Sequence, residues 1–406
     1  MVGQMPNGWA RVSLGDVAEI NPRADRLVGV KTLTFLAMAD VSETGELLNQ
    51  TRVALSDANV QGYTRFRRGD ILCAKITPCF ENGKGGSMAG LLTEYGFGST
   101  EFHVMRAGEK ILPRLLHHIV QSSEFRRRGE QFMTGSAGQK RVPADFIADY
   151  ALLLPPLEEQ HRIVALMDAA DRQIALSEQL AFAADAHART VINELVDGVE
   201  ADHVPLDAVV SRVRRAPEND QALPLTISAS AGLVPQSRFF GKRVAAESID
   251  TYTLLKRDEF AYNKSYSSGY PYGAIKRLEL VDEGILSSLY LCFAIKDQRE
   301  VSLDYMAAVF DSGFFNRQLH MIAHEGARNH GLLNVSADDF FAMRFPLPRH
   351  GDQQRISKIV RLLLARSIKY QGRVRACKEQ KRGLMQLLLS GEKRLLRDLP
   401  GMEHAA

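Results

Sequence analysis

Side chains that can bind nucleic acid gather in clusters along the chain. Arginine, lysine and asparagine can hydrogen-bond to base edges in the major groove, whereas threonine, tyrosine and backbone amides can hold phosphates. In the first half of the chain the candidates are Arg65, Arg67, Arg68, Lys75, Thr77, Asn82, Lys84, Lys140 and Arg141. In the second half they are Asn263, Lys264, Tyr266, Tyr270, Tyr272, Lys276, Arg328, Asn329 and His330.

A solvated surface charge is the commoner role for any one of these residues. Clusters at corresponding places in two halves of one chain favour a shared role instead. The predicted chemistry is binding of double-stranded DNA by local patches, because the formal net charge of the whole chain is only +3.

Motifs for catalysis are missing from the sequence. It has neither the glycine-rich turn that binds S-adenosylmethionine nor the Asn/Asp-Pro-Pro-aromatic loop of amino-methylating enzymes; Asn21-Pro22 is followed by Arg23. The stretch from Gly83 to Ser87 lacks the upstream glycine and the Gly-Lys-Ser/Thr order of a phosphate-binding loop. We therefore expect no catalytic residue, no metal ligand and no cofactor on this chain.

An internal repeat organises the candidates. Gly138–Ile163 aligns without a gap to Gly331–Ile356, at an offset of 193 residues, with nine identities in 26 positions. Each half runs from a β-rich globular segment through a proline-containing joint into a long helical pattern. The sequence therefore predicts two related halves of mixed α/β structure.

Two long helices follow the joints. Apolar or small residues recur at alternating spacings of four and three, which is typical of a coiled-coil seam. Only Lys381 carries a charge in that stripe. The residues assigned to helix pairing and subunit docking are Gln160, Ile163, Met167, Ile174, Val191, Leu195, Gln353, Ile356, Val360, Leu363, Leu384 and Leu388.

The charges of the two helices are complementary. Glu158 to Asp202 holds 10 acidic and 3 basic residues, and Asp352 to Asp398 holds 4 acidic and 13 basic ones. This favours pairing of the two helices with each other as an antiparallel coiled coil related by a pseudo-twofold axis. Tracking of DNA phosphates by the basic helix is the alternative, which the acidic helix would weaken.

Length and composition suit this organisation. A chain of 406 residues exceeds one ordinary core, and 45% hydrophobic with 24% charged residues excludes disordered and collagenous classes. Four scattered cysteines and the lack of a signal peptide or a membrane span predict a cytoplasmic protein. The expected parts are a first globular domain (1–153), a first helical spacer (154–199), a second globular domain (200–345), a second helical spacer (346–395) and a tail (396–406).

The joints and the last helix carry a family resemblance. Leu154-Pro-Pro-Leu-Glu-Glu-Gln-His-Arg-Ile163 and Lys381-Arg-Gly-Leu-Met-Gln-Leu-Leu-Leu-Ser-Gly391 resemble the specificity subunit of Type I restriction–modification enzymes. Stretches such as Ile76-Thr-Pro-Cys-Phe-Glu-Asn-Gly-Lys84 are similar to its target recognition domains. One departure is the second joint, where Arg349 stands in place of the second proline.

The resemblance implies a function for each part. Each target recognition domain reads one half of a bipartite, asymmetric DNA site, and the paired helices set the spacer between the halves. Two modification subunits, adenine N6-methyltransferases that carry S-adenosylmethionine, dock on the helices, and restriction subunits use ATP and magnesium. A structural coiled-coil adaptor whose globular ends bind proteins is the rival hypothesis, and a self-sufficient enzyme is a third.

Overall fold

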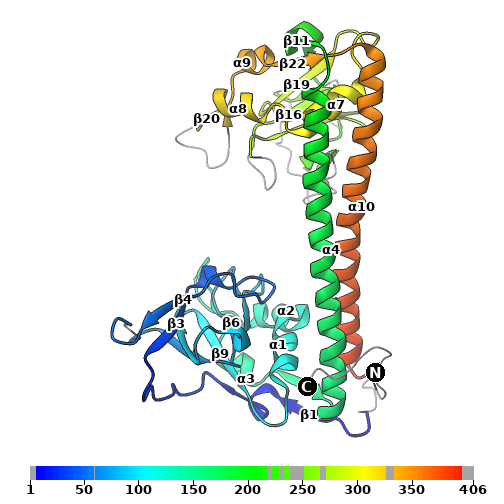
Figure 1. Ribbon diagram of the computed structural model, residues 1–406. Coiled ribbons are helices and arrows are strands. Elements are labelled where there is room, and N and C mark those ends of the chain that lie inside the picture. The colour runs from blue at the N-terminus through cyan, green and yellow to red at the C-terminus, as the bar shows by residue number, and fades with distance from the viewer. Residues whose placement is uncertain are drawn as a thin grey trace. The chain divides into compact units, whose positions relative to one another are not determined.

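The computed structural model describes residues 6–58, 60–136, 138–217, 222–228, 232–237, 251–265, 271–325 and 333–395. The chain forms two compact units. The first contains the described residues up to Ser177 together with those from Arg373 onward, and the second runs from Glu178 to Gly372. The expected mixed α/β class with long helices is confirmed: strands and short helices form the globular parts, and the chain also contains two helices of 41 and 40 residues (Figure 1).

The described residues of the first globular domain form ten strands and three short α-helices. The strands are β1 (Ala10–Ser13), β2 (Ala18–Ile20), β3 (Thr32–Leu36), β4 (Thr51–Ala54), β5 (Thr64–Arg67), β6 (Ile71–Ala74), β7 (Gly85–Ser87), β8 (Tyr95–Gly98), β9 (Phe102–Ala107) and β10 (Ala151–Leu154). The helices are α1 (Pro113–Gln121), α2 (Ser123–Phe132) and α3 (Ala144–Ala148). Three 3-10 turns complete the described elements: η1 (Leu14–Asp16), η2 (Met38–Asp40) and η3 (Met88–Gly90).

The second globular domain contains the following described elements. Its strands are β11 (Asp202–Pro205), β12 (Val210–Arg212), β13 (Leu225–Ser228), β14 (Gly232–Pro235), β15 (Thr253–Lys256), β16 (Phe260–Asn263), β17 (Ala274–Arg277), β18 (Glu283–Leu286), β19 (Tyr290–Ile295), β20 (His324–Glu325), β21 (Leu333–Asn334) and β22 (Arg344–Leu347). Its helices are α5 (Leu206–Val209), α7 (Leu303–Ser312), α8 (Asn316–Ile322) and α9 (Ala337–Ala342).

The same sheet recurs in both units. The order β2-β9-β6-β7 in the first unit corresponds to β12-β19-β16-β17 in the second, and the pair β1-β10 corresponds to β11-β22. Strand β6 pairs with β9 from Ile71 opposite Met105, and β16 pairs with β19 from Phe260 opposite Phe293. This register makes Ile71 equivalent to Phe260, and it makes the residues that follow the two strands, Lys75 and Lys264, equivalent to each other.

A hydrophobic core holds each sheet against its helices. In the first unit α1 packs on β6, β7 and β9, and Leu115, Ile119 and Phe125 are buried. In the second unit α7 packs on β17, and Tyr305, Met306 and Val309 are buried. The buried run of β6 is continuous and apolar, as expected for a strand covered on both faces.

The long helices are α4 (Leu157–Asp197) and α10 (His350–Leu389). Pro155 and Pro156 precede α4, where proline is tolerated, and no proline interrupts either helix. Gly391 has φ 75°, a left-handed conformation that suits glycine just after a helix end. None of the described helices combines the length and the apolar character that crossing a membrane requires.

The two helices run antiparallel within each unit. In the first unit Asp171 of α4 forms an ion pair with Lys381 of α10, and Ser177 Oγ lies 3.9 Å from Cys377 Sγ. In the second unit the hydroxyl of Ser367 donates to Asp185 at 3.3 Å. All positions of the 4–3 stripe are buried or half-buried in α4 and in α10.

Candidate nucleic-acid interface

The C-terminal end of β6 carries the densest group of predicted DNA-binding residues. The backbone amide of Thr77 donates to Lys140 O at 2.9 Å, and that of Val142 donates to Lys75 O at 2.9 Å. Arg141 forms isolated β-bridges with Thr134 and with Ile76, so these residues lie beside the strand end. The structure thus brings together Lys75 (half-buried), Thr77, Lys140 (exposed) and Arg141.

Arg141 is held by a carboxylate in this group. Its Nη2 lies 2.7 Å and its Nε 2.9 Å from the two oxygens of Glu101, a bidentate ion pair. The hydrogen bonds from Arg141 lower the pKa of Glu101, and in turn they raise the pKa of Arg141. A phosphate at this position would have to compete with Glu101 for the guanidinium.

The remaining candidates of the first unit lie on other elements. Arg65 and Arg67 belong to β5 in the sheet β4-β3-β8-β5, and Arg68 follows them. Arg67 lies 3.7 Å from Asp25, and Arg68 lies 3.7 Å from Glu94.

Two further candidates of the first unit make local polar contacts. The side-chain amide of Asn82 donates to Glu43 at 2.9 Å, and Lys84 Nζ donates to Met38 O at 3.1 Å. Lys84 therefore has a structural contact, whereas Asn82 is exposed.

The equivalent site in the second unit lies at the end of β16. Lys264 Nζ donates to Val335 O at 2.7 Å, and the amide of Leu333 donates to Lys264 O at 2.9 Å. Burial, reinforced by the nearby Arg212, lowers the pKa of Lys264. In the first unit the carbonyl of Val142, which aligns with Val335, is bound instead by His103 Nε2 at 2.9 Å. Lys264 therefore combines a structural role with its place at the predicted interface.

Other second-unit candidates have partners among the described residues. The side-chain oxygen of Asn263 accepts from the amide of Ser265 at 3.0 Å, and Tyr272 Oη lies 3.1 Å from His320 Nδ1. Lys276 Nζ forms an ion pair with Asp311 at 2.5 Å. Tyr266, Tyr270, Arg328, Asn329 and His330 lie outside the described residues.

Gln160 and Gln353 sit at the joints between globular domain and helix. Gln160 is buried and binds backbone groups of Lys110, Leu112 and Pro155, so it ties the first turn of α4 to the start of α1. Gln353 binds Glu300, Ser302 and Pro348 in the same way at the start of α7. We predicted from the sequence that these glutamines take part in helix pairing and subunit docking. In the structure both bind backbone groups at the joint between globular domain and helix.

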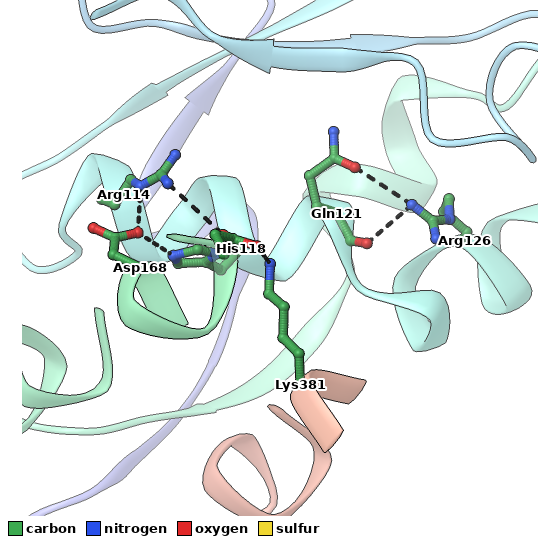
Figure 2. A network of polar contacts seen from close by, with 7 residues as sticks. Arg114, His118, Gln121, Arg126, Asp168 and Lys381 are labelled. Atoms are coloured by element: carbon green, nitrogen blue, oxygen red, sulfur yellow. Dashed lines mark hydrogen bonds and ion pairs between the residues drawn. The ribbon is translucent and has the colours of Figure 1, made fainter. Parts of the chain in front are cut away.

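A polar network in the first unit was missed from the sequence (Figure 2). Arg114 and His118 of α1 both bind Asp168 of α4, with Nε of Arg114 at 2.8 Å and Nε2 of His118 at 2.9 Å from the same oxygen. Lys381 of α10 reaches Asp171, one turn further along α4. Lys381 is the feature of the sequence that indicates this network, because it is the single charged residue of the apolar stripe.

The network contains a possible set of metal ligands. Ligand atoms of His118, Asp168 and Asp171 lie within 4.8 Å of one another. Arg114 and Lys381 already neutralise the two carboxylates, so the group is electrostatically satisfied by the chain's own cations. The arrangement fits a structural junction better than a metal centre.

A groove lies between α2, β10 and the C-terminal part of α10 in the first unit. Its volume is about 1480 Å³, and its cationic lining includes Arg127, Arg128, Arg375, Lys378 and Arg382. Glu124 binds both Arg127 and Arg128, so part of this charge is neutralised. The groove offers positive charge beside the apolar side chains of Met385 and Leu389.

Comparison with known proteins finds similarity to the same family that the sequence motifs resemble. Residues 6–181 match the protein family described as Type I restriction modification DNA specificity domain. The chain is 35% identical over 265 residues to the Type I restriction enzyme EcoAI specificity subunit of Escherichia coli, which covers 63% of this chain and 44% of that protein. It is 33% identical over 267 residues to the EcoEI specificity subunit of Escherichia coli, with the same coverage of 63% and 44%. The chain thus spans less than half the length of the curated relatives it matches.

A solved structure shares the fold. That structure concerns the structural basis of complex assembly and conformational transition of the type I R-M system. The similarity has a TM-score of 0.56 and 16% sequence identity, and it covers 95% of this chain and 98% of the other.

Proposed function

We propose that the chain is a specificity subunit of the Type I restriction–modification family, that it recognises a specific DNA sequence for such a complex, and that it catalyses no reaction itself. The observation that carries the proposal is the recurrence of one site in both units. A lysine directly follows the equivalent strands β6 and β16, and each lysine is hydrogen-bonded to the segment that contains Val142 or Val335.

Each globular domain reads one half of a bipartite site. The two strand ends differ in chemistry, since Ile76 and Thr77 follow Lys75 but Ser265 follows Lys264. Different side chains at equivalent places contact different base edges, so the two half-sites differ and the whole site is asymmetric.

The long helices set the spacer between the half-sites and carry the partners. Their opposite charges and their apolar stripes support an antiparallel coiled coil with a pseudo-twofold axis. Two modification subunits dock on these helices, and the cationic groove beside α10 supports contact with an acidic partner surface.

The chemistry belongs to the partners. The modification subunits bind S-adenosylmethionine and methylate adenine, and restriction subunits supply ATP- and magnesium-dependent translocation and cleavage. The proposed place of action is the cytoplasm. On this chain the strand-end residues bind and orient DNA, and cofactors bind elsewhere in the complex.

Methylation mapping by single-molecule sequencing tests the proposal. Cells that express this chain with a modification subunit should gain one bipartite, asymmetric N6-methyladenine motif, and cells that express the modification subunit alone should not. Soluble, co-purifying proteins that produce no new motif would contradict DNA recognition and favour the adaptor hypothesis. Binding of a short duplex in the presence of nonspecific competitor DNA separates the two hypotheses in vitro.

A further inference from the structure

The same junction is built with opposite charges in the two units. Arg114 is the second residue of α1 and pairs with Asp168 of α4. Asp304 is the second residue of α7 and pairs with Arg361 of α10, and also with Arg277 of β17 in its own domain. Asp168 and Arg361 occupy equivalent helix positions, because they are separated by the repeat offset of 193 residues. The globular domain supplies the cation in the first unit and the anion in the second.

The space behind each ion pair is filled in opposite ways. His118, the sixth residue of α1, is fully buried between Asp168 and the Asp171–Lys381 pair (Figure 2). The sixth residue of α7 is Ala308, and the positions equivalent to Asp171 and Lys381 are Leu364 and Ala188. These three residues belong to the apolar core of the second unit.

An exchange of the two domains would break both junctions. Arg114 would face Arg361, and His118 would lie among apolar groups with no acceptor for its N–H, which is costly for a buried donor. In the reverse exchange Asp304 would face Asp168, and Ala308 would leave the carboxylates of the first junction with fewer donors.

We infer that the two junctions are specificity determinants of assembly: ion-pair polarity and the filling behind it dictate which globular domain docks on which part of the helix pair. Arg114, His118 and Asp304 are positioning residues in this scheme. The inference rests on the contacts within each unit and stands whether or not the chain binds DNA. If the chain does recognise a bipartite site, the junctions also determine the order of its two half-sites.

Hydrogen exchange measured by mass spectrometry on the full chain tests the inference, because it reports opening of α1 and α7 separately. Asp168→Arg puts two cations together and removes the acceptor of His118, so exchange in α1 should rise by about five-fold or more. Arg172→Asp changes an exposed charge one turn further along α4 and should leave α1 unchanged. Exchange in α7 is the folding control for every first-unit variant.

Charge reversal distinguishes a junction that selects its globular domain from an ordinary surface ion pair. Arg114→Asp with Asp168→Arg restores an ion pair but leaves His118 facing an arginine, so α1 should stay loosened. Adding His118→Ala removes the imidazole that faces the new arginine and puts the residue type of Ala308 at that place, so this triple variant should exchange more slowly in α1 than the double variant. Full recovery in the double variant, or no difference between double and triple, would overturn the inference.

A salt titration of the unmodified chain provides a second test that needs no variant. Raising sodium chloride from 0.1 M to 1 M screens the ion pairs of both junctions, so exchange should increase in α1 and in α7. Exchange in α1 and α7 that does not change with salt would contradict the inference, because it would show that the ion pairs do not hold the domain helices.

Discussion

Gln160 and Gln353 hold the same three backbone groups in the two units. Each side-chain oxygen accepts from the amide that precedes a domain helix, Leu112 at 2.9 Å and Ser302 at 2.8 Å. Each side-chain NH2 group donates to a carbonyl of the domain, Lys110 O or Glu300 O, and to a proline carbonyl at the joint, Pro155 O or Pro348 O. A duplicated arrangement of this kind indicates that the angle between domain and helix is determined by the joint itself.

Loss of either glutamine should therefore destabilise its own unit. Gln160→Leu and Gln353→Leu keep the size of the side chain but leave a buried amide and two carbonyls without partners, at a cost of about 1–3 kcal/mol each. Gln354→Leu replaces an exposed neighbour and serves as the control. Chemical denaturation with hydrogen exchange should localise each loss of stability to one unit. Equal stability of all three variants would show that the two glutamines do not stabilise the joints.

The contact of Glu159 with Trp9 and Arg394 should be sensitive to acid. Glu159 accepts from Trp9 Nε1 at 2.9 Å, from Arg394 Nη2 at 2.8 Å and from the amide of Leu395 at 3.1 Å. Burial alone would raise the pKa of Glu159, but the hydrogen bonds from Arg394 and Trp9 outweigh it and lower the pKa. The contact therefore contributes full stability above the ordinary value of 4.5, and this contribution is lost as the pH falls further.

Fluorescence can follow this loss, because Trp9 is the only tryptophan of the chain and is buried. The emission should shift to longer wavelength below pH 4.5, and Glu159→Gln should show a shifted spectrum already at neutral pH. Glu158→Gln, which removes the exposed neighbouring carboxylate, is the matched control. A Glu159→Gln spectrum that matches the parent would show that the contact does not hold Trp9 in place.

Lys75 and Lys264 should respond differently to removal although they are equivalent in position. Lys264→Ala deletes the bond to Val335 O and should lower the melting temperature as well as the affinity for DNA. Lys75→Ala should weaken DNA binding and reduce the slope of log affinity against log salt by about one if it contacts a phosphate, with little change in melting temperature. Unchanged DNA affinity in both variants would remove the two strand ends from the proposed interface.

His117 should make the first unit sensitive to mild acid. It is buried in α1, and burial together with the nearby Arg114 lowers its pKa to about 3. A group whose pKa is lowered on folding stabilises the protein fully above its ordinary pKa of 6.5 and loses that contribution as the pH falls. The first unit should lose about 2 kcal/mol between pH 7 and pH 5, and His117→Leu should flatten this dependence, whereas replacement of the exposed His161 by leucine should not.

Periodicity made much of the helical architecture predictable. Ile163, Met167, Ile356, Val360 and Leu388 lie in the 4–3 stripe and are almost completely buried. Ile192 and Val196 lie outside the stripe and are buried as well, because the second globular domain packs on that side of α4. A heptad pattern describes contacts between helices only, so it carries no information on where a domain docks.

The polar junction and the strand ends illustrate what pattern alone cannot supply. Lys381 was visible as an anomaly, but its partner Asp171 lies 210 positions away in the sequence, and no spacing rule connects them. His118 reads locally as one residue of an amphipathic helix, and only the fold buries it beside Asp168. The pairing of Glu101 with Arg141 likewise could not be predicted, because it depends on two segments that meet in the folded domain.

Insertion of one heptad into each long helix tests the proposed spacer role most directly. Seven residues added to α4 between Ala181 and Ala188, and seven added at the facing part of α10 near Ser367, preserve the apolar stripe and lengthen the pair by about 10 Å, or about three base pairs. Because neither insertion touches the strand ends, both half-sites should stay the same while the unread spacer of the methylated motif becomes longer. Insertion of four residues in α4 alone rotates the stripe away from its partner and should abolish specific methylation. A longer helix pair that methylates altered half-sites at the original spacing would refute the helices as the spacer.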